Sequence, residues 1–304
     1  MKRYTKVLVS VGLIMALAWV PFVGSRLYDE QRNQILIEEE PVPLASNESV
    51  YEKGGTKIDL STASEGYVKV SNSTAKKRLK VQIIKNNTTY NYDLKNGGKS
   101  EIYPLQLGEG QYKVRVLENT TGNKYTPLAE KTLDVKLSSK FAPFLKPSQY
   151  IMYGNDWAVT KKAAEITKGK KTDQEKIEAI YSYIIKNIKY DKQKAATVQT
   201  GYLPNVDETL RTQKGICFDY AAIFTAMLRS QGIPSRMIIG TVSPKDINHA
   251  WNEIYTEEEG WVIVKIPFKG NQWNRMDATF AASGGEEIQR FIGNGQNYTG
   301  LRLY

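Results

Sequence analysis

Residues 215–234 read GICFDYAAIFTAMLRSQGIP, and they predict the helix on which the rest of the fold is built. Gly215 precedes this helix, and Gly232 followed by Pro234 marks its end. The only cysteine of the chain, Cys217, falls in its first turn. Apolar side chains recur at helical spacing and predict one apolar face, made of Ile216, Tyr220, Ile223, Phe224, Met227 and Leu228.

The position of Cys217 at the start of a helix has a chemical consequence. The helix dipole and the unpaired N–H groups of the first turn favour the thiolate over the thiol, and the thiolate is the nucleophilic form. The same N–H groups can donate to an oxyanion that forms on an attacked carbonyl. The alternative is a small buried cysteine that only packs in the core, and the thiol taken alone favours that alternative.

The only histidine of the chain favours a nucleophilic Cys217 over a core cysteine. His249 lies in NHAWNEIY, residues 248–255, whose aromatic and β-branched side chains predict a part-buried strand, with residues 260–266 as its hairpin partner. Asp277 follows in MDATF. A cysteine nucleophile, a histidine base and a carboxylate that orients the imidazole are an established set for acyl transfer.

These three local sequences carry a family resemblance. KGICFDYA, then NHAWNEIY, then MDATF resemble the motifs of the transglutaminase-like superfamily of papain-type cysteine enzymes, over roughly residues 173 to 280. The resemblance implies Cys217 as nucleophile, His249 as base and Asp277 as the orienting carboxylate. One departure is Ala278, where many relatives have proline. The family includes transglutaminases, peptidases, amidases and inactive scaffolds, so it implies the machinery more firmly than the reaction.

The motifs are compatible with more than one oxyanion donor and more than one acyl acceptor. The side chain that assists the backbone in binding the oxyanion is one of Tyr190, Tyr202 and Gln213, which precede the nucleophile in the expected cleft loop. Water as acyl acceptor would make a peptidase or amidase, and an amine would make a cross-linking transglutaminase. The sequence slightly favours hydrolysis, because a lysine-rich exported cross-linker risks joining itself. A non-catalytic wall-binding or assembly module is the alternative from another class.

The aromatic side chains near the two later motifs do not settle this choice. Trp251, Trp261 and Trp273 would suit a cleft that excludes water, although strand tryptophans more often belong to the core. No cofactor or metal is expected, since one cysteine and one histidine make no zinc ligand set.

Length and composition predict two domains with real cores. The chain has 304 residues, of which 41% are hydrophobic and 11% aromatic. The fold class we expect is α+β, with a papain-like, transglutaminase-like domain after a small all-β sandwich of immunoglobulin-like type. The boundaries are residues 1–25 for a signal peptide or anchor, 26–54 for a linker, 55–138 for the sandwich and 139–304 for the transglutaminase-like domain.

The two predicted domains differ in periodicity. In the first, alternating runs separated by turn residues predict six or seven strands, with runs starting at Tyr67, Arg78, Thr88, Ser100, Gln111 and Lys131. In the second, helices are expected at about 156–168 and 173–189, followed by a polar loop that leads to the Cys217 helix. Each domain has its own apolar pattern, so we expect the second to fold by itself.

The N-terminal segment and the charge predict the location of the protein. Lys2, Arg3 and Lys6 precede an apolar stretch at 7–24, which is typical of an export signal or a single membrane anchor. We therefore expect an exported protein of the cell envelope or exterior, with membrane contact only through this segment. The net charge of +10 favours anionic partners, and the expected substrate is a peptide or protein, including cell-wall peptide. Nucleic acid is not expected, because no recognition motif accompanies the charge.

Overall fold

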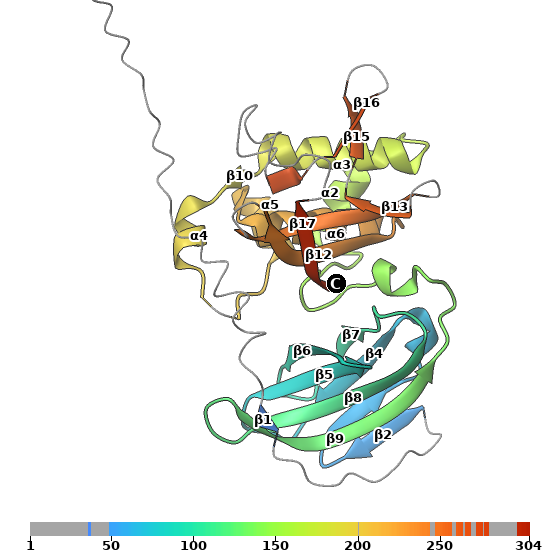
Figure 1. Ribbon diagram of the computed structural model, residues 1–304, viewed down its shortest axis with the longest axis vertical. Helices are drawn as coiled ribbons and strands as arrows, with labels where there is room; N and C mark the ends of the chain where they lie inside the picture. The colour runs from blue at the N-terminus through green and yellow to red at the C-terminus, as the bar shows by residue number, and fades with distance from the viewer. Residues whose placement is uncertain are drawn as a thin grey trace, which may run out of the picture.

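Two domains follow one another along the chain, an all-β domain and a mixed α and β domain (Figure 1). The computed structural model describes residues 49–199, 201–243, 248–255, 260–263, 277–279 and 297–304, and the backbone alone of 36–37, 247, 256, 265–268 and 272–275. The predicted segment at 7–24, most of the predicted linker, Asp246 and the side chain of Trp273 lie outside the described residues. None of the helices in the described part of the chain has the length and apolar character needed to cross a membrane.

The first domain is a sandwich of two sheets. Their strands pair antiparallel, except that β1 runs parallel to β9. One sheet has the order β1 (Leu36–Ile37), β9 (Lys124–Val135), β8 (Gly110–Asn119), β5 (Leu79–Lys85), β6 (Thr88–Leu94). The other has the order β2 (Val50–Lys53), β3 (Thr56–Asp59), β4 (Tyr67–Asn72), β7 (Glu101–Pro104). Alternate side chains of β4, β5 and β8 meet between the sheets, as Val68, Val81 and Val114 do in the buried core.

The described part of this domain has nine strands, β1 to β9, instead of the predicted six or seven, because β1, β2 and β3 precede the predicted runs. Residues Val50–Lys53, placed in the linker by their polarity, form β2, because they find backbone partners on β3 (Val50 opposite Asp59). The last strand, expected from Lys131, begins at Lys124 and runs as one element through Pro127. The sheet tolerates Pro127 because the β8–β9 register shifts at Val116/Leu117, next to it.

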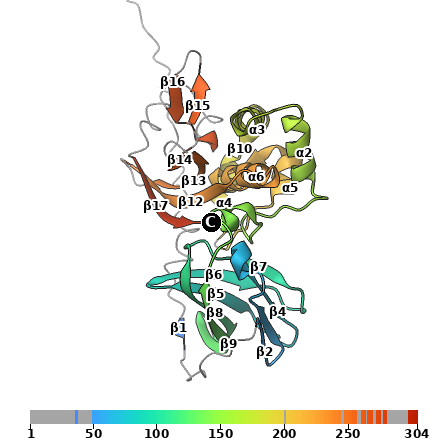
Figure 2. The ribbon, with the colours of Figure 1, turned by 90° about the vertical axis from the view of Figure 1, so that its right-hand side faces the viewer.

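The second domain packs helices against one face of a four-stranded sheet (Figure 2). The sheet has the order β14 (Gly260–Ile263), β13 (Ile247–Thr256), β12 (Ser235–Val242), β17 (Tyr298–Leu303), all antiparallel. The helices are α2 (Ala158–Thr167), α3 (Asp173–Asn187), α4 (Lys192–Thr197), α5 (Val206–Thr212) and α6 (Cys217–Ser230). Two short ladders complete it, β10 (Lys189–Tyr190) with β11 (Lys214–Gly215), and β15 (Lys265–Phe268) with β16 (Gln272–Arg275). The predicted hairpin partner of the histidine strand is therefore confirmed as β14, whereas the predicted polar loop contains α4 and α5.

The central helix α6 is buried on every side rather than on one face. All its residues from Cys217 to Arg229 are buried. Helices α2, α3 and α5 pack on it from one direction, and strands β12 and β13 from the other. The one-face pattern was wrong because small residues such as Ala221, Ala222 and Ala226, which carry little periodic signal, let neighbours approach the remaining surface closely.

The two domains meet at a tyrosine-rich contact. The ring of Tyr304 lies edge-on to Tyr90 of the sandwich, with centroids 5.5 Å apart, and 4.5 Å from the ring of Tyr150. Gln149 holds the backbone of Asp93 with both ends of its amide, accepting from its N–H at 3.0 Å and donating to its carbonyl at 2.8 Å. One buried apolar cluster thus continues from the sandwich into the second domain.

Candidate active site

Cys217 is the first residue of α6 and is 3% exposed. The preceding residue, Ile216, is extended, and its N–H donates to the carboxylate of Asp219 at 2.9 Å. The β10–β11 ladder brings Tyr190 opposite Gly215, two residues before the thiol. The local sequence thus determines that the helix begins at Cys217. The strand β10, which is distant in sequence, lies beside the residues that precede this cysteine.

His249 reaches the thiol from strand β13. The side chain of Cys217 interacts with the imidazole of His249 and contributes to raising its pKa. Strand β13 is fixed on α6 by Asn252, whose Nδ2 donates to the Ala221 carbonyl at 2.9 Å and to Thr225 Oγ1 at 2.7 Å. Because Asn252 lies three residues beyond His249, these bonds set where the imidazole stands relative to the start of α6.

Asp277 hydrogen-bonds the imidazole and completes the group of three residues. Its Oδ2 lies 2.6 Å from Nε2 of His249, and its Oδ1 accepts from the N–H of Thr279 at 2.9 Å. With Nε2 occupied by the carboxylate, Nδ1 is the ring nitrogen that faces the thiol. The structure therefore brings together all three residues that the motifs pointed to.

The charge balance of these three residues favours a protonated imidazole. Burial opposes the cation on His249, but the charge and hydrogen bond of Asp277, with a further contribution from Cys217, raise its pKa from 6.5 to about 10. A protonated imidazole next to a thiol is the partner that a thiolate requires.

Aromatic rings cover the histidine. Trp251 stacks on His249 with the ring planes 16° apart, and Tyr298 meets Trp251 edge-on at 5.0 Å. Gly240 on β12 makes room for this stack, because a Cβ there would lie 2.7 Å from Trp251 Cη2 and 2.0 Å from the Thr299 carbonyl oxygen. Trp251 is thus part of the core around the site, and Trp261 packs instead against Phe144 at 4.9 Å.

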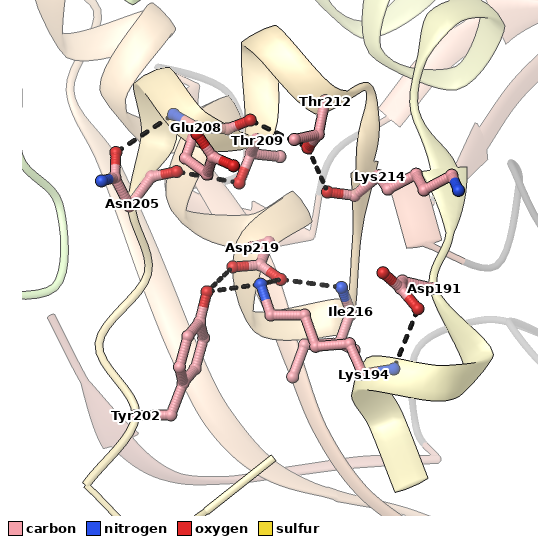
Figure 3. Close-up of polar contacts among 10 residues, drawn as sticks. All are labelled: Asp191, Lys194, Tyr202, Asn205, Glu208, Thr209, Thr212, Lys214, Ile216 and Asp219. Atoms are coloured by element: carbon pink, nitrogen blue, oxygen red, sulfur yellow. Dashed lines mark hydrogen bonds and ion pairs between the residues drawn. The ribbon is translucent and has the colours of Figure 1, made fainter. Parts of the chain in front are cut away.

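The three candidate oxyanion donors lie in different places. Tyr190 is close enough to Cys217 that the sulfur contributes, after burial, to raising the pKa of its hydroxyl. Tyr202 donates its hydroxyl proton to Asp219 (Figure 3). Gln213 ends α5 in a left-handed conformation, with φ 52°, and its side chain is exposed. Of the three, Tyr190 is the one whose hydroxyl interacts electrostatically with the thiol.

Two residues that make hydrogen bonds at the site, Asp219 and Asn252, were not predicted as site residues from the sequence. Asp219 occupies the acidic position of the first motif, and Asn252 lies in the strand with His249. Two sequence features would have indicated these residues: Asp219 is a carboxylate in an apolar helix, and Asn252 is an amide in an apolar strand. Buried polar groups of this kind require hydrogen-bond partners. In the described ranges, no three His, Cys, Asp or Glu side chains come together as metal ligands would.

Comparison with known proteins identifies the domain that carries this site. Residues 160–266 match the family model described as the transglutaminase-like superfamily, so this part of the chain is similar to transglutaminase-like domains. The match includes Cys217 and His249 and ends before Asp277. The predicted resemblance and the predicted α+β fold class are confirmed.

Individual relatives are distant and much longer than the shared part. The uncharacterised protein YebA of Bacillus subtilis (strain 168) is 24% identical over 196 residues, which are 58% of this chain and 26% of YebA. The kyphoscoliosis peptidase of Homo sapiens is 27% identical over 121 residues, 36% of this chain and 16% of that protein. The chain thus spans about a quarter or less of the length of these relatives.

Among solved structures, the periplasmic domain of TgpA from Pseudomonas aeruginosa matches with a TM-score of 0.35 and 14% identity. The match covers 86% of this chain and 81% of that chain.

Proposed function

We propose that this protein is a cysteine-dependent acyl-transfer enzyme that acts on amide bonds. The observation that carries the proposal is the buried pairing of His249 with Asp277, with Nε2 and Oδ2 2.6 Å apart, together with the interaction of this imidazole with Cys217. A core cysteine has no need of a paired imidazole and carboxylate, whereas a nucleophile does.

The proposed reaction has two stages. The sulfur of Cys217 attacks the amide carbonyl, and the resulting oxyanion accepts from backbone N–H groups of the first turn of α6 and from the hydroxyl of Tyr190. His249 gives its proton to the leaving amine, which departs and leaves a thioester on Cys217. His249 then takes a proton from the acceptor as it attacks the thioester, and the freed thiolate recovers its imidazolium partner.

Water is the proposed acceptor, which makes the enzyme a peptidase or amidase. Trp251 belongs to the packed core around His249 and so gives no support to a cleft built to admit a lysine-like amine. The human relative is named a peptidase, which agrees with hydrolysis. A peptide at the cell surface, including cell-wall peptide, is the proposed substrate, and an exported location follows from the pattern at 7–24.

The alanine variant of the nucleophile tests the chemistry. We expect Cys217→Ala to abolish amide hydrolysis and amine incorporation while the circular dichroism spectrum and melting temperature stay close to those of the wild type. No other cysteine exists to take over the reaction. Undiminished turnover by the purified variant would falsify the assignment.

A second assay identifies the acceptor. The wild-type protein is incubated with a glutamine-containing peptide and a labelled primary amine, and ammonia, free acid and amine conjugate are followed together. We expect acid to exceed conjugate. Conjugate that forms much faster than acid would make the protein a transglutaminase, and a wild-type thiol that is inert to alkylating probes would favour the non-catalytic module.

A further inference from the structure

Asp219 is a fully buried carboxylate in the first turn of the helix that carries Cys217. Its Oδ2 accepts from the N–H of Ile216 at 2.9 Å and from Lys194 Nζ at 2.7 Å, and its Oδ1 accepts from the hydroxyl of Tyr202. Its exposed fraction is 0%, and Gly215 lies so close that a Cβ there would stand 2.6 Å from the Cβ of Asp219. Figure 3 shows these partners converging from three segments of the chain.

A buried negative charge at this position conflicts with a thiolate. The carboxylate satisfies an N–H ahead of the helix, but it lies two residues from Cys217 in a region of low dielectric constant. Like charges within one helical turn disfavour one another, so an uncompensated Asp219 would oppose a negative charge on the sulfur. A nucleophilic Cys217 therefore needs the charge of Asp219 to be balanced.

Lys194 is placed to provide this balance. It lies on α4, whose first turn is capped by Asp191, and its ammonium group contacts both Asp219 and the Tyr202 hydroxyl. Its side chain is 29% exposed, so the ammonium keeps contact with solvent while the carboxylate does not. We propose that Lys194 neutralises the charge of Asp219, with a hydrogen bond from Tyr202, and thereby favours the nucleophilic form of Cys217, so that Asp219, Lys194 and Tyr202 are positioning residues of the reaction.

Other titratable groups face the thiol from neighbouring strands. His249 of β13, paired with Asp277, interacts with Cys217, and Tyr190 of β10 interacts with Cys217 electrostatically. Asp191 and Tyr220 act on Tyr190 electrostatically. The imidazole of His249 provides the positive partner of the sulfur. Lys194 offsets the charge of Asp219, the carboxylate in the same helical turn as Cys217.

The test measures the alkylation rate of the thiol, which requires no substrate. Because Cys217 is the only cysteine, the rate with iodoacetamide between pH 5 and 9, followed by mass spectrometry of the full chain, reports on this sulfur alone. We expect Lys194→Met to slow alkylation near neutral pH by about three- to tenfold and to move the profile to higher pH. Lys192→Met, which changes an exposed lysine of the same helix, should leave the profile unchanged.

Two further variants separate charge balance from damage to the fold. Adding Asp219→Asn to Lys194→Met removes the unbalanced charge and should restore most of the wild-type rate. Lys194→Arg should retain the wild-type profile. These expectations hold at temperatures where melting curves show each variant folded.

The possible results distinguish this inference from the function on which it rests. A reactive wild-type thiol with an unchanged profile in Lys194→Met would overturn the inference alone. A double variant no faster than Lys194→Met would overturn it as well, since the loss of rate would then be structural. A wild-type thiol that does not react would overturn the proposed function itself.

Discussion

His249 and Asp277 lie 28 positions apart in sequence, and both are almost completely buried. At a separation of 2.6 Å, the carboxylate fixes both the orientation of the ring and the tautomer that presents Nδ1 to the sulfur. The cost of burying two ionisable side chains is offset only while they remain paired. Changing one partner should therefore alter chemistry and stability in ways that can be measured separately.

Replacement of the carboxylate tests its role in catalysis. Asp277→Asn keeps the shape of the side chain but favours the wrong tautomer of His249. We expect a loss of up to ~10⁴ in rate, by analogy with serine triads. Asp246→Asn is the control, since Asp246 lies only three residues before His249 in sequence. A severe loss in Asp246→Asn with a mild one in Asp277→Asn would assign the role to Asp246.

The raised pKa of His249 predicts how stability depends on pH. A pKa of about 10 in the folded protein, above the ordinary 6.5, means that protonation of His249 favours folding. This contribution is fully present below about pH 6.5 and is lost as the pH rises toward 10. The difference in unfolding free energy between wild type and His249→Gln should therefore shrink across this window in urea titrations. A constant difference would contradict the assigned charge state.

At the level of elements, the site depends on how α6 and β13 are held together. The start of α6 fixes Cys217, and strand β13 carries His249, but neither element sets the distance to the other. The two hydrogen bonds of Asn252 to the body of α6 fix this relation, at 2.9 Å to the Ala221 carbonyl and 2.7 Å to Thr225 Oγ1. Their removal should therefore affect activity as well as stability.

Asn252→Ala tests this link. We expect a loss of about 1–3 kcal/mol in unfolding free energy, since buried partners are left unsatisfied. We also expect a fall of at least ~10-fold in activity, because small displacements of reacting groups are costly.

The control for Asn252→Ala is a second buried asparagine far from the site. Asn72 donates to Thr56 Oγ1 at 2.7 Å within the sandwich, so Asn72→Ala should lose similar stability and keep its activity. Equal losses of activity in both variants would show that Asn252 acts only through stability.

At the level of the whole molecule, the two domains share part of their core. Tyr304 and Tyr150 of the second domain pack with Tyr90 and Tyr92 of the sandwich. The buried guanidinium of Arg229, at the far end of α6, donates to the carbonyls of Lys146 at 2.7 Å and of Tyr304 at 3.0 Å. The nucleophile helix is therefore connected to the domain boundary.

This shared core predicts the behaviour of the isolated second domain. We expect residues 139–304 to fold and to react with thiol probes, because α6 and the sheet that covers it belong to this part. We also expect its melting temperature to lie below that of the full chain, which should unfold in one calorimetric transition. Two separate transitions in the full chain, with the upper one equal to that of the fragment, would show independent domains.

Several secondary-structure elements of this protein are predictable from the local sequence alone. The start of α6 at Cys217, the strand that carries His249, its hairpin partner and most strands of the sandwich follow from periodicity and turn residues, because short-range sterics and amphipathicity act within a few positions. The three motifs also pointed to Cys217, His249 and Asp277. Their contact is a fact of the tertiary structure.

The contacts around the nucleophile depend on the tertiary structure, because they join residues that are distant in sequence. Strand β2 depends on backbone partners in β3, and the burial of α6 on all sides depends on several helices and the sheet. The contacts of Asp219 with Lys194 and Tyr202 join residues up to 25 positions apart. No local pattern specifies such partners, because a buried charge is satisfied by whichever distant group the packed chain brings to it.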